Sequence, residues 1–251
     1  MKQTKLWRLA PFIATFCLCV SSTRAASTSG CDNSPRRVGV LGAEGNNQPA
    51  ISIPANIRAE LPRFKEALLL LPSGLAGPDE QMIVYNSSKD ELDPRPKIAF
   101  LVNGKLAKLF DTSEFAPSGG GFDRYLASCR LQVAKGQPAV AIAISTAGDG
   151  TGSAFAIILW QSSGYRVIFK RQVSQGRIEF EDSALELWNR SFSVIQSEKS
   201  EMVECEWCPH RYNITQYVWR GDQYVKTGSQ RTKRKFDPAE ITGKPLIIQK
   251  H

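Results

Sequence analysis

Short apolar runs separated by turn residues fill the chain from Gln81 onward. The runs at 97–102 and 105–110 flank Asn103-Gly104, which is a strong signal for a two-residue β-hairpin. The other runs cover 82–85, 125–133, 139–145, 154–160, 165–172, 177–180, 184–188, 192–196, 213–219 and 223–227. Many short strands joined by turns predict a mainly β (β-rich α+β) domain built from antiparallel hairpins.

Two of these runs, Ala139–Ser145 and Ala154–Trp160, are apolar at nearly every position. A strand with one wet face alternates apolar and polar residues, so these two are expected to be central strands covered on both faces. The segment between them, 146–153, is rich in glycine. It lacks the lysine of a phosphate-binding loop, so it predicts a flexible hairpin connection.

Good helix formers occupy residues 53–61 and 63–71, which Pro62 separates and Pro72 ends. The pattern predicts one or two short N-terminal helices. The apolar run Leu68–Leu71 is also compatible with a buried strand, because such a short run does not settle the type of element.

Two predicted hairpins resemble each other. Trp160 and Tyr165 lie five residues apart across a glycine-containing turn, and Trp219 and Tyr224 repeat this arrangement 59 residues later. Together with the Asn103-Gly104 hairpin, they suggest a degenerate repeat of four-stranded units in a propeller-like or sandwich arrangement. Aromatic cross-strand pairs in unrelated hairpins are the alternative. The four aromatic residues form the candidate binding surface, although the protein core is the usual place for such side chains.

The segment 217–224, Tyr-Val-Trp-Arg-Gly-Asp-Gln-Tyr, resembles the closing hairpin of exported bacterial proteins with integrin-α-like (FG-GAP or VCBS) β-repeats. The resemblance covers under a tenth of the chain. The Asp-rich calcium loops of that family are missing here, so the resemblance does not imply bound calcium.

The first residues follow the order of a secretory signal peptide. Basic residues at 2, 5 and 8 precede an apolar run over 9–20, and Thr23-Arg24-Ala25 places small residues where cleavage requires them. An uncleaved anchor is the alternative, but the run has twelve residues whereas a spanning helix needs about 20. We therefore expect a signal peptide at 1–25, a flexible leader at 26–50, a single β-rich domain at 51–251 without a transmembrane segment, and a secreted or periplasmic location.

Removal of the signal peptide changes the charge of the chain. The full chain has a formal net charge of +8, and four basic and no acidic residues leave with 1–25, which gives +4 for the mature chain. Part of the excess lies in the run Gln230–Lys235. Such a run can bind nucleic acid, an acidic polymer or an anionic membrane surface, but a solvated loop or strand edge is its simplest interpretation. The sequence does not identify a partner; an envelope protein or polysaccharide is compatible with an exported chain, and nucleic acid is not expected.

Four cysteines remain after cleavage: Cys31, Cys129, Cys205 and Cys208. In an oxidising compartment an even number predicts two disulfides, and we expect the pairs 31–129 and 205–208. Cys205-x-x-Cys208 could also be a redox centre. Zinc binding together with His210 is a further alternative, but a fourth ligand is not evident.

Hydrolytic chemistry has few candidate residues. The chain contains two histidines and no serine-hydrolase or zinc-protease motif. A carboxylate pair of the glycosidase type could come from the residues Glu179, Glu181, Asp182 and Glu186, which are also typical of the wet face of a half-buried strand. The sequence thus predicts a non-catalytic exported binding or structural module without a cofactor or metal. The alternatives are a thiol-disulfide redox protein and a carboxylate-dependent hydrolase.

Overall fold

The computed structural model describes residues 30–32, 52–87, 96–115, 122–146, 152–190, 194–197, 200–203, 205 and 208–249. The predicted signal peptide, most of the predicted leader and most of the glycine-rich loop lie outside these residues. Within them the chain is mainly β, with two short α-helices.

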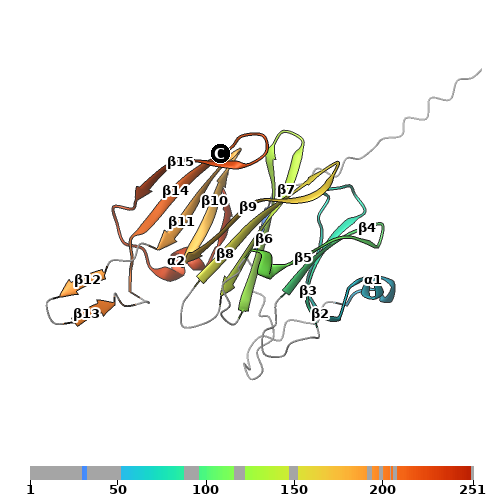
Figure 1. The fold of residues 1–251 in the computed structure, drawn as a ribbon, viewed down its shortest axis with the longest axis horizontal. Helices are drawn as coiled ribbons and strands as arrows, with labels where there is room; N and C mark the ends of the chain where they lie inside the picture. Colours follow the sequence, from blue (N-terminus) through green and yellow to red (C-terminus); the bar gives the residue numbers. More distant parts are fainter. Residues whose placement is uncertain are drawn as a thin grey trace, which may run out of the picture.

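Three successive antiparallel sheets form the body of the molecule (Figure 1). The first sheet has the strands β2 (Phe64–Pro72), β3 (Glu80–Ser87), β4 (Pro96–Val102) and β5 (Lys105–Asp111). The second has β6 (Phe122–Ala134), β7 (Gln137–Thr146), β8 (Gly152–Gln161) and β9 (Gly164–Ser174). The third has β10 (Gly176–Glu181), β11 (Ala184–Arg190), β14 (Tyr212–Trp219) and β15 (Tyr224–Arg231).

Short elements complete these four-stranded units. The strand β1 (Gly30–Asp32) pairs with β6, and β16 (Leu246–Ile248) pairs in parallel with β10. The hairpin of β12 (Val194–Ser197) and β13 (Ser200–Val203) is inserted between β11 and β14. The helices are α1 (Ala55–Glu60), the 3-10 turn η1 (Thr112–Glu114) and α2 (Pro238–Thr242).

The second sheet lies between the other two (Figure 1). Alternate residues of β7 and β8 face opposite sides, as the pleat of a strand requires. Ala141 and Ile157 belong to the core shared with the third sheet, whereas Ile142 and Ile158 belong to the core shared with the first. The prediction that these strands are central and covered on both faces is confirmed.

Each outer face of the stack is covered differently. Over the first sheet, Ile57 of α1 packs on Ile83 and Tyr85. Over the third sheet, α2 contributes Ile241 to a small cluster with Trp188 and other aromatic residues. This cluster occupies one part of the outer face of the third sheet, and the carboxylates described below occupy another.

The helix prediction is confirmed at residues 55–60, whereas residues 64–72 form a strand, the alternative that the sequence leaves open for Leu68–Leu71. Arg63 has a left-handed backbone (φ 53°), and the next residues form β2, which pairs with β3. Tertiary pairing of an apolar run therefore overrides its helix propensity. The second helix, α2, lies near the carboxyl end, where Asp237 and Glu240 form a capping box around Pro238.

The three hairpins singled out in the sequence occupy matching places. The Asn103-Gly104 turn joins β4 and β5, and both residues have positive φ, as a tight hairpin requires. Cross-strand partners are Trp160 with Tyr165 in β8–β9, and Trp219 with Tyr224 in β14–β15. Each hairpin joins the third and fourth strands of its unit. The units resemble propeller blades in strand order and a sandwich in their face-to-face packing.

Candidate functional site

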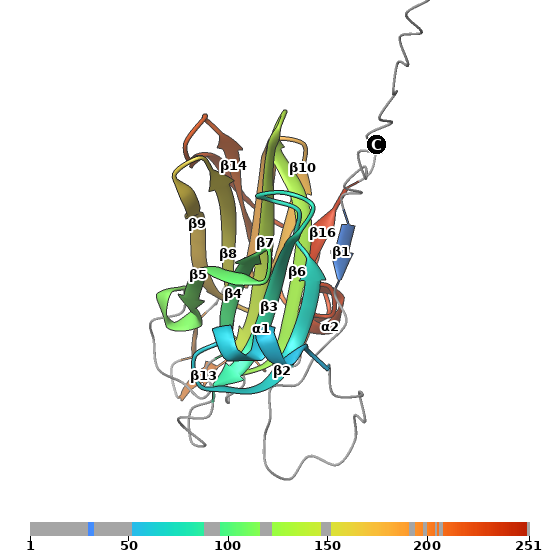
Figure 2. The same cartoon turned by 90° about the vertical axis from the view of Figure 1, so that its right-hand side faces the viewer.

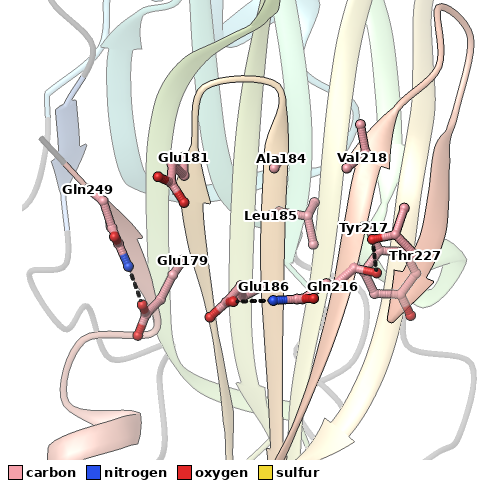
Figure 3. A pocket seen from close by; sticks show the side chains of 10 residues that line it. All are labelled: Glu179, Glu181, Ala184, Leu185, Glu186, Gln216, Tyr217, Val218, Thr227 and Gln249. Carbon is pink, nitrogen blue, oxygen red and sulfur yellow. Dashed lines mark hydrogen bonds between the residues drawn. The ribbon is translucent and has the colours of Figure 1, made fainter. Parts of the chain in front are cut away.

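A pocket of about 230 Å³ with a mixed polar and apolar lining lies on the outer face of the third sheet (Figure 3). Strands β10, β11, β14 and β15 and the residue that follows β16 contribute its lining. The lining residues are Glu179, Glu181, Ala184, Leu185, Glu186, Gln216, Tyr217, Val218, Thr227 and Gln249. Three of the four carboxylates that the sequence suggested therefore line one pocket.

Strand register sets the order of the polar side chains. Glu179 of β10 is directly opposite Glu186 of β11, and Glu186 is directly opposite Gln216 of β14. These residues form one row across three strands. The neighbouring row contains Ala184 opposite Val218, so a short apolar strip borders the polar row. Asp182 lies in the β10–β11 turn and does not line the pocket.

Glu179 is the most enclosed carboxylate of the row, with 8% of its surface exposed. One carboxylate oxygen, Oε1, forms an ion pair with Arg177, and the other, Oε2, accepts a hydrogen bond from Gln249 Nε2 at 2.6 Å. Two like charges placed directly opposite each other on adjacent strands are destabilising. The guanidinium of Arg177 offsets this repulsion and holds the Glu179 side chain in place.

Glu186 and Gln216 are joined side chain to side chain. The amide Nε2 of Gln216 donates to Glu186 Oε1 at 2.9 Å (Figure 3). A β-bulge follows Gln216, and the Thr227 hydroxyl donates to the Gln216 carbonyl at 3.3 Å. Opposite Gln216 stands Gly228, where an added Cβ would lie 3.1 Å from Gln216 Oε1. The bulge and the glycine together leave room for the amide in the row.

Most of the carboxylate oxygens in the row already have partners within the protein. The two oxygens of Glu179 contact Arg177 and Gln249, and Oε1 of Glu186 accepts from Gln216. Among the described residues, no group of three or more His, Cys, Asp or Glu side chains could hold a metal ion.

The aromatic residues proposed as a binding surface lie mainly in the cores. Trp219 and Tyr224 are 7% and 8% exposed and belong to the core between the second and third sheets. Trp160 and Tyr165 are partly buried against the core between the first and second sheets, where Tyr165 stacks on Phe100 with ring centroids 4.5 Å apart. Core packing, the alternative considered from the sequence, describes their position.

The cysteines lie in the two expected pairs. Cys31 and Cys129 are register partners in β1 and β6, with their Cα atoms 4.0 Å apart, and they form a disulfide. Cys205 and Cys208 form the other, with Cα atoms 5.3 Å apart. Two disulfides fit an oxidising compartment, outside the cell or in the periplasm.

The basic run near the carboxyl end lies at a strand edge and in the loop that follows. Arg231 ends β15, the edge strand of the third sheet, and is exposed. The Arg234 guanidinium lies over the ring of Phe236, 3.8 Å from its centroid. This placement agrees with the interpretation as a solvated strand edge and loop.

Comparison with known proteins gives no matching family, no similar curated protein and no similar solved structure. No helix in the described part of the chain has the length and apolar character needed to cross a membrane.

Gln216, Thr227 and Gln249 are pocket residues that the sequence did not reveal. Gln249 lies 70 residues from Glu179, and Gln216 lies 30 residues from Glu186. The pairing of β11 with β14 brings Gln216 to Glu186, and the pairing of β10 with β16 brings Gln249 to Glu179. Only knowledge of the strand pairing and register would have placed these residues beside the carboxylates.

Proposed function

We propose that this chain is an exported, non-catalytic binding module whose ligand contacts the carboxylate and amide row of the third sheet. The main evidence for the proposal is the row of Glu179, Glu186 and Gln216, whose order is set by strand register and whose last two side chains are hydrogen-bonded. The two disulfides support an exported location.

The chemistry of the row favours a polysaccharide ligand. Carboxylate oxygens accept hydrogen bonds from sugar hydroxyls, and amide groups both donate and accept. The apolar strip of Ala184 and Val218 beside the row suits the less polar face of a sugar ring. A volume of about 230 Å³ fits a short part of a polymer and not a large cofactor.

A glycan array probed with the mature chain tests this proposal, and titration calorimetry then measures the affinity for the best glycan. Glu186→Gln keeps the shape of the side chain but removes its charge. It should weaken binding about tenfold, because hydrogen bonds to charged groups contribute more than neutral ones. Asp182→Asn is the matched control. It removes one carboxylate from the adjacent exposed turn, where asparagine tolerates the positive φ of 49°.

Two results would count against the proposal: no glycan bound on the array, or unchanged affinity in Glu186→Gln. If the chain instead releases reducing ends from a glycan that it binds, and Glu186→Gln abolishes this release, the carboxylate-hydrolase alternative replaces the proposal.

The redox alternative rests on Cys205, which is exposed. Thiol trapping on the native exported protein, at increasing concentrations of a mild reductant, distinguishes the two functions. A structural disulfide should resist reduction. A Cys205–Cys208 disulfide that is readily reduced, and that oxidises two thiols of a reduced test peptide by thiol-disulfide exchange, would favour a thiol-disulfide redox protein.

A further inference from the structure

The fourth strands of the units gather on one side of the stack. Figure 2 shows β5 and β9 on the same side as β14, the neighbour of β15, with β1, β16 and β6 on the other side. Each of β5, β9 and β15 is the last strand of its sheet, so one edge of its backbone has no partner strand in that sheet. Together these three strands form one edge of the molecule, which we call the basic edge.

The basic edge carries charge of almost one sign. It has two lysines on β5, three basic residues on β9 and two on β15, seven in all, against the single acidic residue Asp111. Asp111 forms an ion pair with Lys97 of the neighbouring strand, and Lys105 forms one with Glu60 of α1 at 2.8 Å, which leaves six basic residues to supply the charge of the edge. All seven basic residues are exposed: Lys105, Lys108, Arg166, Lys170, Arg171, Lys226 and Arg231.

Cations of β9 link the three layers. Arg166 donates to the carbonyl of Asp222, in the turn before β15, at 2.7 Å. Lys170 donates to the carbonyl of Glu114, just after β5, at 3.2 Å. Stacked sheets lie about 10 Å apart, so the three strands are within roughly 20 Å of one another. The Debye length is about 8 Å at physiological salt, so a polyanion that spans the edge would be attracted by the cations of each strand largely separately.

Protection against edge-to-edge aggregation explains why individual edge strands carry charged residues, lysine in particular. It does not require that the edge strands of three sheets lie on one side of the molecule, with seven of their eight charged residues positive. We propose that the basic edge binds an acidic polysaccharide that runs across the three layers. A polysaccharide is the polyanion that suits the oxidising compartment indicated by the disulfides. The seven basic residues do not line the pocket, although Thr227 of β15 does, and the inference does not depend on the function of the pocket.

Binding to immobilised polygalacturonate, with neutral dextran as the reference surface, tests this inference. The variant Lys108→Glu/Lys170→Glu/Lys226→Glu reverses the charge of one exposed lysine on each of β5, β9 and β15. Each edge strand still carries charged residues, so its protection against strand pairing is retained. The variant should bind at least about tenfold more weakly than the unchanged chain. Binding of the unchanged chain should also fall steeply as salt rises, because exposed charges are screened.

The control variant is Lys65→Glu/Lys135→Glu/Lys244→Glu. It makes the same change in net charge at exposed lysines outside the basic edge, and it should bind within about twofold of the unchanged chain. Urea unfolding of both variants checks that they remain folded.

Three results would overturn the inference: equal losses in both triple variants, equal binding to neutral dextran, or tighter binding to duplex DNA than to polygalacturonate. Binding of the pocket glycan should be unchanged in Lys108→Glu/Lys170→Glu/Lys226→Glu. Failure of the basic edge and failure of the proposed pocket function are therefore separate outcomes.

Discussion

Buried polar side chains connect neighbouring layers of this molecule. Glu80 of β3 is 1% exposed, and its carboxylate accepts hydrogen bonds from the Tyr165 hydroxyl of β9 and from the Ala76 amide, the latter at 2.7 Å. Burial and the neighbouring carboxylate raise the pKa of Tyr165, which keeps its hydroxyl protonated as a donor. This pair joins the first sheet to the second with a hydrogen bond inside an otherwise apolar interface.

Tyr212 allows a prediction about alkaline pH. The side chain is fully buried, and burial raises its pKa to about 12 from the usual value near 10. A raised folded-state pKa means that folding favours the neutral phenol. This contribution to stability is complete below pH 10 and is lost as the pH rises toward 12. Tyr212→Phe should therefore reduce the loss of unfolding free energy between pH 8 and pH 11 by about 1 kcal/mol, as measured by urea unfolding.

Tyr85 provides the comparison at pH 8. Its hydroxyl donates to the Pro62 carbonyl at 3.1 Å, so Tyr85→Phe should cost about 0.5–1.5 kcal/mol. The Tyr212 hydroxyl has no hydrogen-bond partner among the residues that the structure describes, so Tyr212→Phe should cost less at this pH. Equal costs for the two variants at pH 8, or the same pH dependence with and without Tyr212, would contradict these assignments.

At the scale of the elements, close packing around Gly176 constrains the junction between β9 of the second sheet and β10 of the third. Gly176 begins β10, separated from the end of β9 by one residue, and an added Cβ there would clash with the carbonyl oxygen of Trp188 and with Val173. Gly176→Ala should lower the unfolding free energy by about 1–3 kcal/mol, because backbone atoms cannot move aside at little cost. Urea unfolding measures this change.

Gly136 is the reference glycine for this test. It has a positive φ of 74°, and a Cβ added there would meet nothing within 4 Å. Alanine at this position should cost about 1 kcal/mol from backbone strain alone. A Gly176→Ala variant as stable as Gly136→Ala would show that the junction of β9 and β10 relaxes more readily than its contacts indicate.

The elements also show what the sequence could reveal. Continuous apolar runs identified β7 and β8 as central because burial on both faces leaves no polar periodicity. Helix formers over 63–71 favour a helix, whereas the apolar run Leu68–Leu71 is also compatible with a strand, and pairing with β3 determines the structure there. Glu179 and Glu186 could be recognised as neighbours because one hairpin joins them, whereas Gln249 reaches Glu179 only through β16, whose parallel pairing has no local signal. The resemblance of 217–224 to exported β-repeat proteins stays a prediction.

At the scale of the whole molecule, one disulfide crosses a long stretch of chain. Cys31 and Cys129 are separated by 98 residues, whereas Cys205 and Cys208 are separated by three. A crosslink that closes a longer loop restricts the unfolded chain more. Cys31→Ala/Cys129→Ala should therefore lose about 2–5 kcal/mol of unfolding free energy, more than Cys205→Ala/Cys208→Ala, in denaturant unfolding under non-reducing conditions. A larger loss in the second variant would contradict this ranking.

The short strand β1 has a consequence for producing the protein. It pairs with β6 through only three residues, and Cys31 in its centre is bonded to Cys129 of β6. If the chain is made where thiols stay reduced, β1 depends on those three pairs alone. Its release would expose the edge of β6 at Ser128–Arg130 that faces away from β7. Such an edge can recruit strands from other copies of the chain. Yield and solubility in a recombinant host should therefore depend on whether the Cys31–Cys129 disulfide forms before the chains associate with one another.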